Sequence, residues 1–261
     1  MLEVIILSII QGVTEFLPVS SSGHLILVAK YFNFNNQNLT LELSLHLGSL
    51  LAIIYYFKND LLDFINNKIL FFKILISSIP VMIVGFLLMK LDLIDLLRNY
   101  KLIGWTTIIF AILLYISDLI KTNKTIQKDF NLKSALFVGL FQVLSLVPGV
   151  SRSGITITAG RFLNFNRADS AKISFLMSIP TLAAVGIYNL KNIYSENNYE
   201  FSMLNFFAIF LSFFFSYITI KYFLFYLKKF NLTIFVIYRI FLGIIILLFS
   251  YLLINYGYIF K

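Results

Sequence analysis

Apolar stretches long enough to cross a membrane recur along almost the whole chain, and they constrain its fold more than any other feature. Several reach about 18–20 residues, the length that an α-helix needs to cross the hydrocarbon core of a bilayer. Hydrophobic residues make up 59% of the 261 residues, and charged residues only 13%, well below the share typical of soluble domains. The sequence therefore predicts an all-α polytopic membrane protein.

Six of the apolar stretches are predicted to be full spans, whereas two others are interrupted. The predicted spans are Leu39–Phe57, Phe71–Met89, Leu102–Ile120, Ala171–Leu190, Leu204–Phe225 and Thr233–Tyr256. Val4–Leu17 and Leu132–Val147 each run into a cluster of Pro, Ser and Gly, after which the apolar sequence resumes. Because each half is too short to cross a bilayer, each pair is predicted to form a re-entrant helix hairpin.

The two interrupted stretches match each other without a gap at an offset of 131 residues. The matched residues include Gln11 with Gln142, Val19 with Val150, Ser20, Ser22 and Gly23 with Ser151, Ser153 and Gly154, and Asn33-Phe34-Asn35 with Asn164-Phe165-Asn166. We therefore expect one membrane domain built from two repeats, residues 1–121 and 132–256, each with one hairpin and three spans. Since three is odd, the second repeat must enter the membrane from the opposite side, which makes the repeats inverted.

Basic residues are concentrated in the loops 58–73, 121–133, 161–172 and 226–232. These loops carry twelve lysines and arginines, and the other side of the predicted topology carries six. The positive-inside rule then places these four loops in the cytoplasm and both termini outside. This scattered distribution also argues against a nucleic-acid surface, despite the net charge of +9. The absence of cysteine excludes disulfides and thiolate catalysis.

The first interruption, residues 11–24, reads Gln-Gly-Val-Thr-Glu-Phe-Leu-Pro-Val-Ser-Ser-Ser-Gly-His. Gln11 and Glu15 are four residues apart and therefore share one face of a helix. Pro18 is expected to stop that helix, and the serines after it can cap the next one. Gly23 allows a close backbone approach, and His24 would project from the first turn of the second half-helix.

The second interruption, residues 148–156, reads Pro-Gly-Val-Ser-Arg-Ser-Gly-Ile-Thr and places Arg152 at the position of Ser21. Ionisable groups at membrane depth are costly and by default mark a functional site. Free amides at half-helix N-termini attract anions, and an arginine adds a bidentate donor suited to phosphate. The two interruptions together predict a site for a phosphate group carried by a lipid.

Four residues are the predicted catalytic set: Glu15, Ser21, His24 and Arg152. Residues expected to bind the phosphate, besides Arg152, are Ser20, Ser22, Gly23, Ser151, Ser153, Gly154 and Thr156. Two routes remain open at this point. Ser21 can act as the nucleophile with His24 or Glu15 as its base, or water can attack directly while His24 transfers protons.

Structural roles compete with these catalytic ones. Serine and threonine in membrane helices commonly serve packing and capping alone. Glu15 and Arg152 can also be read as a buried structural ion pair, and His24 as a structural residue. His46 lies inside a full span and is predicted to be a hydrogen-bonded core histidine. Gln142 is expected only to support its hairpin.

Both motifs resemble those of the undecaprenyl-diphosphate phosphatase family, also known as bacitracin-resistance proteins. The family's first motif is similar to residues 11–24 and its second to residues 148–156, and Phe175–Pro180 also resembles a family segment. The resemblance covers essentially the whole chain. It implies a multi-pass protein of the bacterial inner membrane that hydrolyses undecaprenyl diphosphate to the monophosphate carrier of peptidoglycan synthesis. It also implies bacitracin resistance and a divalent cation, Mg²⁺ or Ca²⁺.

One position departs from the family pattern, because many members have glutamate where this chain has Gln11. An amide is a poorer metal ligand than a carboxylate, so metal binding should rest mainly on Glu15, with Gln11 as a weak ligand. Expected partners are a polyprenyl diphosphate lipid and membrane lipids, without nucleic acid, and we allow for a homodimer.

Three alternatives are weighed against this activity. An inverted-repeat transporter or flippase for a polyprenyl phosphate lipid would use the same architecture, and phosphate release in detergent would discriminate. An inactive lipid-binding protein would bind the diphosphate without turnover. Lipid phosphatases of the phosphatidic-acid type need a histidine after their Ser-Arg segment, whereas His24 and His46 both precede Arg152.

Overall fold

The computed structural model describes residues 1–32, 39–66, 68–91, 93, 97, 99–195 and 202–255. Within these ranges every secondary-structure element is a helix. The prediction of an all-helical polytopic protein is confirmed at this level. The long helices are α3 (Leu39–Tyr56), α5 (Lys68–Lys90), α6 (Tyr100–Asp118), α10 (Arg167–Ser195), α11 (Met203–Leu227) and α12 (Thr233–Asn255). The shorter ones are α1 (Leu2–Thr14), α2 (Ser21–Tyr31), α4 (Lys58–Asn66), α7 (Ile126–Asp129), α8 (Leu132–Val143), the 3₁₀ helix η2 (Leu144–Leu146) and α9 (Arg152–Phe162).

Five helices, rather than the six predicted spans, are long and apolar enough to cross a membrane: α5, α6, α10, α11 and α12. The remaining predicted span is α3, whose fully described part, Thr40–Tyr56, falls among the shorter apolar helices. The predicted end of the last span, Tyr256, lies outside the described residues.

Both predicted interruptions are present as breaks between short helices. After α1, turns continue through Val19, and α2 begins at Ser21. The second break follows η2, and α9 begins at Arg152. Ser20 and Ser151 have positive φ values of 75° and 70°, a conformation that non-glycine residues rarely adopt. These serines are 131 residues apart, so the two breaks share a backbone conformation at equivalent positions.

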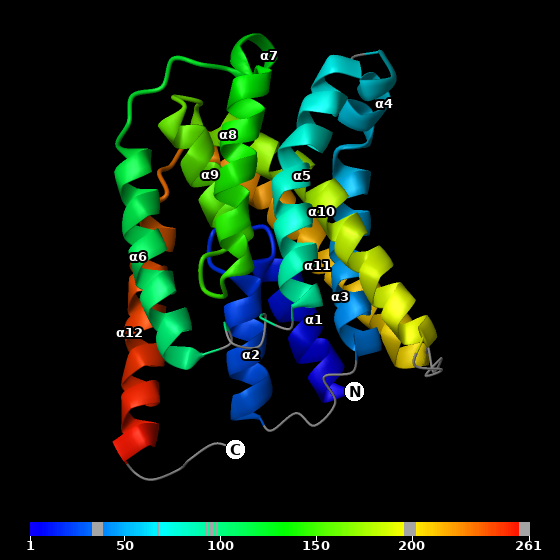
Figure 1. Ribbon diagram of the computed structural model, residues 1–261, viewed down its shortest axis with the longest axis vertical. Helices are drawn as coiled ribbons and strands as arrows, with labels where there is room; N and C mark the ends of the chain where they lie inside the picture. The colour runs from blue at the N-terminus through cyan, green and yellow to red at the C-terminus, as the bar shows by residue number, and fades with distance from the viewer. Residues whose placement is uncertain are drawn as a thin grey trace.

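The two short-helix pairs approach each other from opposite ends of the helical bundle. In Figure 1, α1 and α2 lie in the lower half, α8 and α9 lie in the upper half, and both breaks lie near mid-height. The hydroxyl of Ser153 in the second break donates a hydrogen bond to the carbonyl of Leu17 in the first, at 2.7 Å. The fold therefore brings segments that are more than a hundred residues apart in the chain into direct contact.

Long helices hold each short-helix pair in an equivalent way. α1 and α3 pack against α11, whereas α8 and α10 pack against α5. α6 packs against α12, and α3 packs against α10. At the contact of α8 with α5, a Cβ at Gly139 would lie 2.2 Å from the Ser77 carbonyl oxygen, so only glycine fits there.

One predicted loop is partly wrong. Residues 58–73 were expected to connect two spans, but they contain α4 and the first turn of α5. α4 is short, and it carries Asp60 in its first turn, where an acidic residue favours a helix N-terminus. Lys172 of α10 pairs with Asp60, which ties α4 to the bundle.

Candidate active site

An ion pair joins the two breaks at the centre of the molecule. Arg152 Nη2 donates a hydrogen bond to Glu15 Oε1 at 2.7 Å, although the residues are 137 positions apart. Their side chains are only 14% and 6% exposed, respectively. A carboxylate and a guanidinium buried at this depth are strongly coupled, because removing either would leave an uncompensated charge. The structure therefore brings together the two most polar candidates of the sequence.

The other oxygen of Glu15 accepts two further hydrogen bonds. Gln11 Nε2 donates to Oε2 at 3.0 Å, as expected for residues on one helix face, and Ser21 Oγ donates to it at 2.7 Å. The Gln11 amide nitrogen also lies 3.0 Å from His46 Nδ1. His46 is thus hydrogen-bonded, as predicted, but its partner belongs to the site rather than to the apolar core.

His24 faces a tyrosine that sequence reasoning missed. Its Nδ1 lies 2.7 Å from the Ser20 carbonyl oxygen, and its Nε2 lies 2.5 Å from the Tyr238 hydroxyl. The two rings are nearly parallel, with centroids 5.7 Å apart. Since a carbonyl can only accept, Nδ1 carries the proton and Nε2 is directed at Tyr238. Within the described chain, neither ring nitrogen of His24 is hydrogen-bonded to Ser21 or Glu15.

The polar residues of the second break are largely satisfied by the protein itself. Ser151 caps α9 by accepting from the Gly154 amide at 3.2 Å, a structural role for a residue that was predicted to bind the phosphate. Thr156 is fully buried and donates to Ser174 at 2.7 Å. Together with Ser153, which donates to the Leu17 carbonyl of the first break, these hydroxyls fix the backbone of the second break and of the start of α9. The side chain of Ser22 is outside the described structure, and Gly23 lies in the first turn of α2.

Arg239 of α12 is the second functional candidate that the sequence analysis missed. It is fully buried, and its Nη2 donates to the carbonyls of Gly149 and Val150 at 2.9 and 3.0 Å. Its Nη1 reaches the Pro18 carbonyl at 3.4 Å, so one side chain spans both breaks. The sequence could have indicated Arg239, because an arginine inside an apolar span is by default a functional candidate. The prediction missed it because it considered only the charged residues of the loops and of the two interruptions.

The donor set at Glu15 fits a divalent cation in one specific way. Gln11 Oε1 is buried and has no hydrogen-bond partner in the described structure, so an amide oxygen remains beside the Glu15 carboxylate. Within the described residues, no three histidine, aspartate or glutamate side chains cluster as metal ligands. Mg²⁺ commonly uses one or two carboxylates and takes its other ligands from phosphates and water. These residues could therefore hold a cation only together with a phosphorylated substrate.

Comparison with known proteins decides the family. The family model of the bacitracin resistance protein BacA matches residues 4–245. This chain belongs to the BacA family. A curated relative from Pelagibacter ubique, named undecaprenyl-diphosphatase, is 51% identical over 251 residues, covering 96% of this chain and 98% of the relative. Relatives of the same name from Roseobacter denitrificans and Campylobacter curvus are 37% and 39% identical, covering 95% and 94% of this chain and 98% and 97% of their own lengths.

Membership of the BacA family agrees with the motif resemblance on which the sequence analysis relied. The matched range, residues 4–245, contains both breaks and the α12 residues Tyr238 and Arg239. The residues of the candidate site thus lie inside the part of the chain that the family model matches.

Proposed function

We propose that this chain hydrolyses undecaprenyl diphosphate to undecaprenyl phosphate and inorganic phosphate. The Glu15–Arg152 pair between the two breaks carries the proposal, because it joins a base to an anion-binding group inside a membrane protein. The relatives' names supply the substrate. The product is the lipid carrier that peptidoglycan synthesis consumes, and its recycling would confer bacitracin resistance.

Arg152 is the group that receives the terminal phosphate. Its Nη1 is buried without a hydrogen-bond partner in the described structure, so one donor of the fork remains available. A phosphate that binds there competes with Glu15 for the guanidinium. As the pair separates, Glu15 becomes free to accept a proton. Substrate binding and activation of the base are thereby linked through one side chain.

Ser21 is the proposed nucleophile and Glu15 its base. The Ser21 hydroxyl already donates to Glu15 Oε2 at 2.7 Å, within the range for proton transfer. Its proton passes to Glu15, and Oγ forms a bond to the terminal phosphorus while the bond from that phosphorus to the bridging oxygen breaks. Undecaprenyl phosphate leaves, and water then hydrolyses the phosphoserine to release inorganic phosphate. Ser21→Ala should stop turnover, whereas direct attack by water would leave much of it.

Glu15 and Gln11 Oε1 would hold Mg²⁺ or Ca²⁺ beside the diphosphate. The cation supplies positive charge that offsets the charge developing on the phosphate oxygens. Ser20, Ser22, Gly23, Ser151, Ser153, Gly154 and Thr156 shape the two half-helix starts, whose amides provide further donors. His24, fixed by Tyr238, would transfer protons to or from water at this site.

The same proposal includes an inverted-repeat topology in the bacterial inner membrane, with repeats at residues 1–121 and 132–256. Two observations support it. Ser20 and Ser151, 131 residues apart, both have positive φ values. In addition, α1 and α3 of the first repeat pack against α11 of the second, and α8 and α10 of the second repeat pack against α5 of the first. The α1–α2 and α8–α9 pairs would be re-entrant, and α3, packed between α10 and α11, would be the sixth span. Twelve of the basic residues would then face the cytoplasm, and both termini would lie outside. A homodimer is compatible with this arrangement.

Phosphate release by the purified protein tests the function. In detergent no gradient or second compartment exists, so a transporter would release no phosphate from undecaprenyl diphosphate. We expect steady release that stops when EDTA removes the cation and resumes when Mg²⁺ or Ca²⁺ is restored. Binding of the lipid without release, by protein that remains folded, would favour the transporter or the inactive lipid-binding protein instead.

A further inference from the structure

A second polar pocket lies at the far end of α9 from Arg152. Its volume is about 480 Å³, and it is formed where α6, α9 and α11 end and α10 begins. Four basic side chains line it: Lys121, Arg161, Arg167 and Lys228. Asp118 is the one acidic side chain among the lining residues, which leaves a formal excess of three positive charges. This pocket plays no part in the function proposed above.

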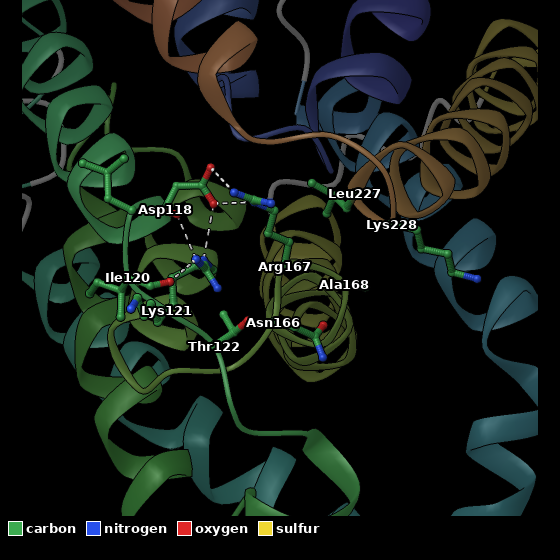
Figure 2. A pocket seen from close by; sticks show the side chains of 11 residues that line it. Asp118, Ile120, Lys121, Thr122, Asn166, Arg167, Ala168, Leu227 and Lys228 are labelled. Atoms are coloured by element: carbon green, nitrogen blue, oxygen red, sulfur yellow. Dashed lines mark hydrogen bonds and ion pairs between the residues drawn. The ribbon is translucent and has the colours of Figure 1, made fainter.

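Asp118 organises the pocket and neutralises only part of its charge. Its carboxylate accepts two hydrogen bonds from Arg167, Oδ1 from Nε at 2.7 Å and Oδ2 from Nη2 at 3.2 Å, and Figure 2 shows the two groups facing each other. Arg161 Nε lies 3.4 Å from the same carboxylate. The Leu232 amide donates to it as well, at 3.0 Å. One buried carboxylate is thus shared between two guanidinium groups.

Arg161 has a structural role in addition. It is 2% exposed, and it donates to the carbonyls of Asp118, Ile120 and Phe165 at 2.7–2.9 Å. These bonds hold the chain after α6 against the end of α9. The lining of the pocket is therefore fixed before any ligand arrives, which lowers the entropic cost of binding.

The remaining positive charge is accessible. The Arg167 side chain is 34% exposed, and its Nη1 makes no hydrogen bond in the described structure. Lys121 and Lys228 are exposed, and no ion pair of either ammonium group is found among the described residues. In Figure 2 the Lys228 side chain extends away from Asp118. The pocket thus offers one fixed guanidinium and two adaptable ammonium groups, a set suited to an anion.

The position of the pocket indicates where the anion comes from. Three helices that are long and apolar enough to cross a membrane, α6, α10 and α11, begin or end here, so the pocket lies at the expected depth of lipid headgroups. Leu119 lines the pocket and is 66% exposed, and Phe230, in the connection that follows Lys228, is 54% exposed. Basic pockets between membrane helices, next to exposed apolar side chains, are typical sites for the phosphate of an anionic lipid.

We propose that this pocket binds a phosphate-bearing anion at the membrane surface, namely the headgroup of an anionic phospholipid. The site is distinct from the Glu15–Arg152 pair. Arg152 and Arg161 are nine residues apart on α9, a separation of about 14 Å along the helix. A single phosphate group is too small to contact both arginines.

Binding of two separate probes to the purified protein tests the proposal. Phosphatidylglycerol retention is measured by native mass spectrometry, with phosphatidylcholine as the net-neutral comparison, and inorganic phosphate is added as a competitor. The variant Lys121→Gln/Lys228→Gln removes two pocket charges on exposed side chains. The matched control, Lys128→Gln/Lys133→Gln, removes two exposed lysines from the same end of the molecule but outside the pocket.

We expect the pocket variant to bind phosphatidylglycerol about ten-fold more weakly than the wild type, and the control to bind it normally. Retention of the lipid that millimolar phosphate does not displace assigns the site to a headgroup. If millimolar phosphate does displace phosphatidylglycerol, the pocket is still an anion site, but its ligand is free phosphate rather than a lipid headgroup. Equal binding of both lipids by the wild type, or equal losses in the two variants, would overturn the proposal. Because binding is measured without turnover, failure here leaves the proposed hydrolysis unaffected.

Discussion

The imidazole of His24 is held on both of its nitrogens, by the Ser20 carbonyl and by the Tyr238 hydroxyl. Such second contacts fix which nitrogen carries the proton and in which direction the ring points. Glu15 is held in the same sense, because one oxygen faces Arg152 and the other faces Gln11 and Ser21. In the proposed mechanism, the reaction depends on these orientations as much as on the identity of the ionisable groups.

Replacing Tyr238 with phenylalanine tests the orientation of His24. Tyr238→Phe keeps the stacked ring but removes the hydroxyl, so kcat should fall about 5- to 10-fold, equivalent to roughly 1 kcal/mol for one lost hydrogen bond. The readout is phosphate release under saturating substrate. Tyr222→Phe makes the same chemical change on an exposed position of α11 and should leave kcat unchanged. Equal rates for the wild type and Tyr238→Phe would remove His24 orientation from the mechanism.

Glu15 and Arg152 could be predicted from the sequence, but Tyr238 and Arg239 were not. The first two lie in motifs that interrupt an apolar pattern, where a polar residue stands out. Tyr238 belongs to a long aromatic-rich span, in which one tyrosine among fifteen in the chain carries no local signal. Its contact with His24 joins residues 214 positions apart, and only the packing of α2 near α12 creates it.

At the scale of secondary-structure elements, close helix contacts position the two breaks. α8 lies against α5 at Gly139, where any side chain would meet the Ser77 backbone. Gly149 has a φ of +91° and faces Thr106 and Ile103 of α6, so the second break is pressed against α6. The breaks are thus held by the neighbouring long helices as well as by their own hydrogen bonds.

Alanine at Gly139 should separate α8 from α5. The added Cβ would lie 2.2 Å from a backbone oxygen that cannot move independently, so Gly139→Ala should destabilise the fold by about 1–3 kcal/mol. The measurement is the thermal unfolding midpoint in detergent, which should fall. Gly186→Ala is the matched control, since its Cβ makes an ordinary 3.9 Å contact and alanine favours helix. Similar midpoints for the two variants would show that the contact is looser than described.

The starts of α2 and α9 followed from the sequence, because proline, serine and glycine mark breaks clearly. α4 did not, since nine residues with mixed polarity resemble a loop when no neighbour is known. α3 could be predicted, since its bounds, Leu39–Tyr56, match the predicted span to within one residue.

At the scale of the whole molecule, the two pairs of short helices enter from opposite ends and meet between the long helices (Figure 1). The end at which α6 and α11 finish carries the basic loops and the Asp118 pocket. α12 ends, and α1 begins, at the opposite end (Figure 1). Charge asymmetry between the two ends is what the positive-inside rule uses to predict orientation.

Single cysteines test that orientation, because the chain has none of its own. Lys133→Cys lies near the start of α8, and Ser202→Cys precedes α11 at the other end. In intact cells, a membrane-impermeant maleimide should label only Ser202→Cys, and Lys133→Cys should react once the membrane is permeabilised. The reverse pattern would mean that the basic loops lie outside.

The most direct test of the Glu15–Arg152 site is phosphate release from undecaprenyl diphosphate by the wild type and by two isosteric variants. Glu15→Gln removes the central carboxylate. Glu42→Gln, the control, removes a carboxylate that lies 3.9 Å from His46, and the Glu42 side chain is 54% exposed. Arg152→Gln is measured in parallel, and size-exclusion profiles confirm that each protein is folded. The account predicts that kcat falls by about 100-fold or more in Glu15→Gln and Arg152→Gln, and by less than about three-fold in Glu42→Gln. Near-normal release by folded Glu15→Gln would contradict it.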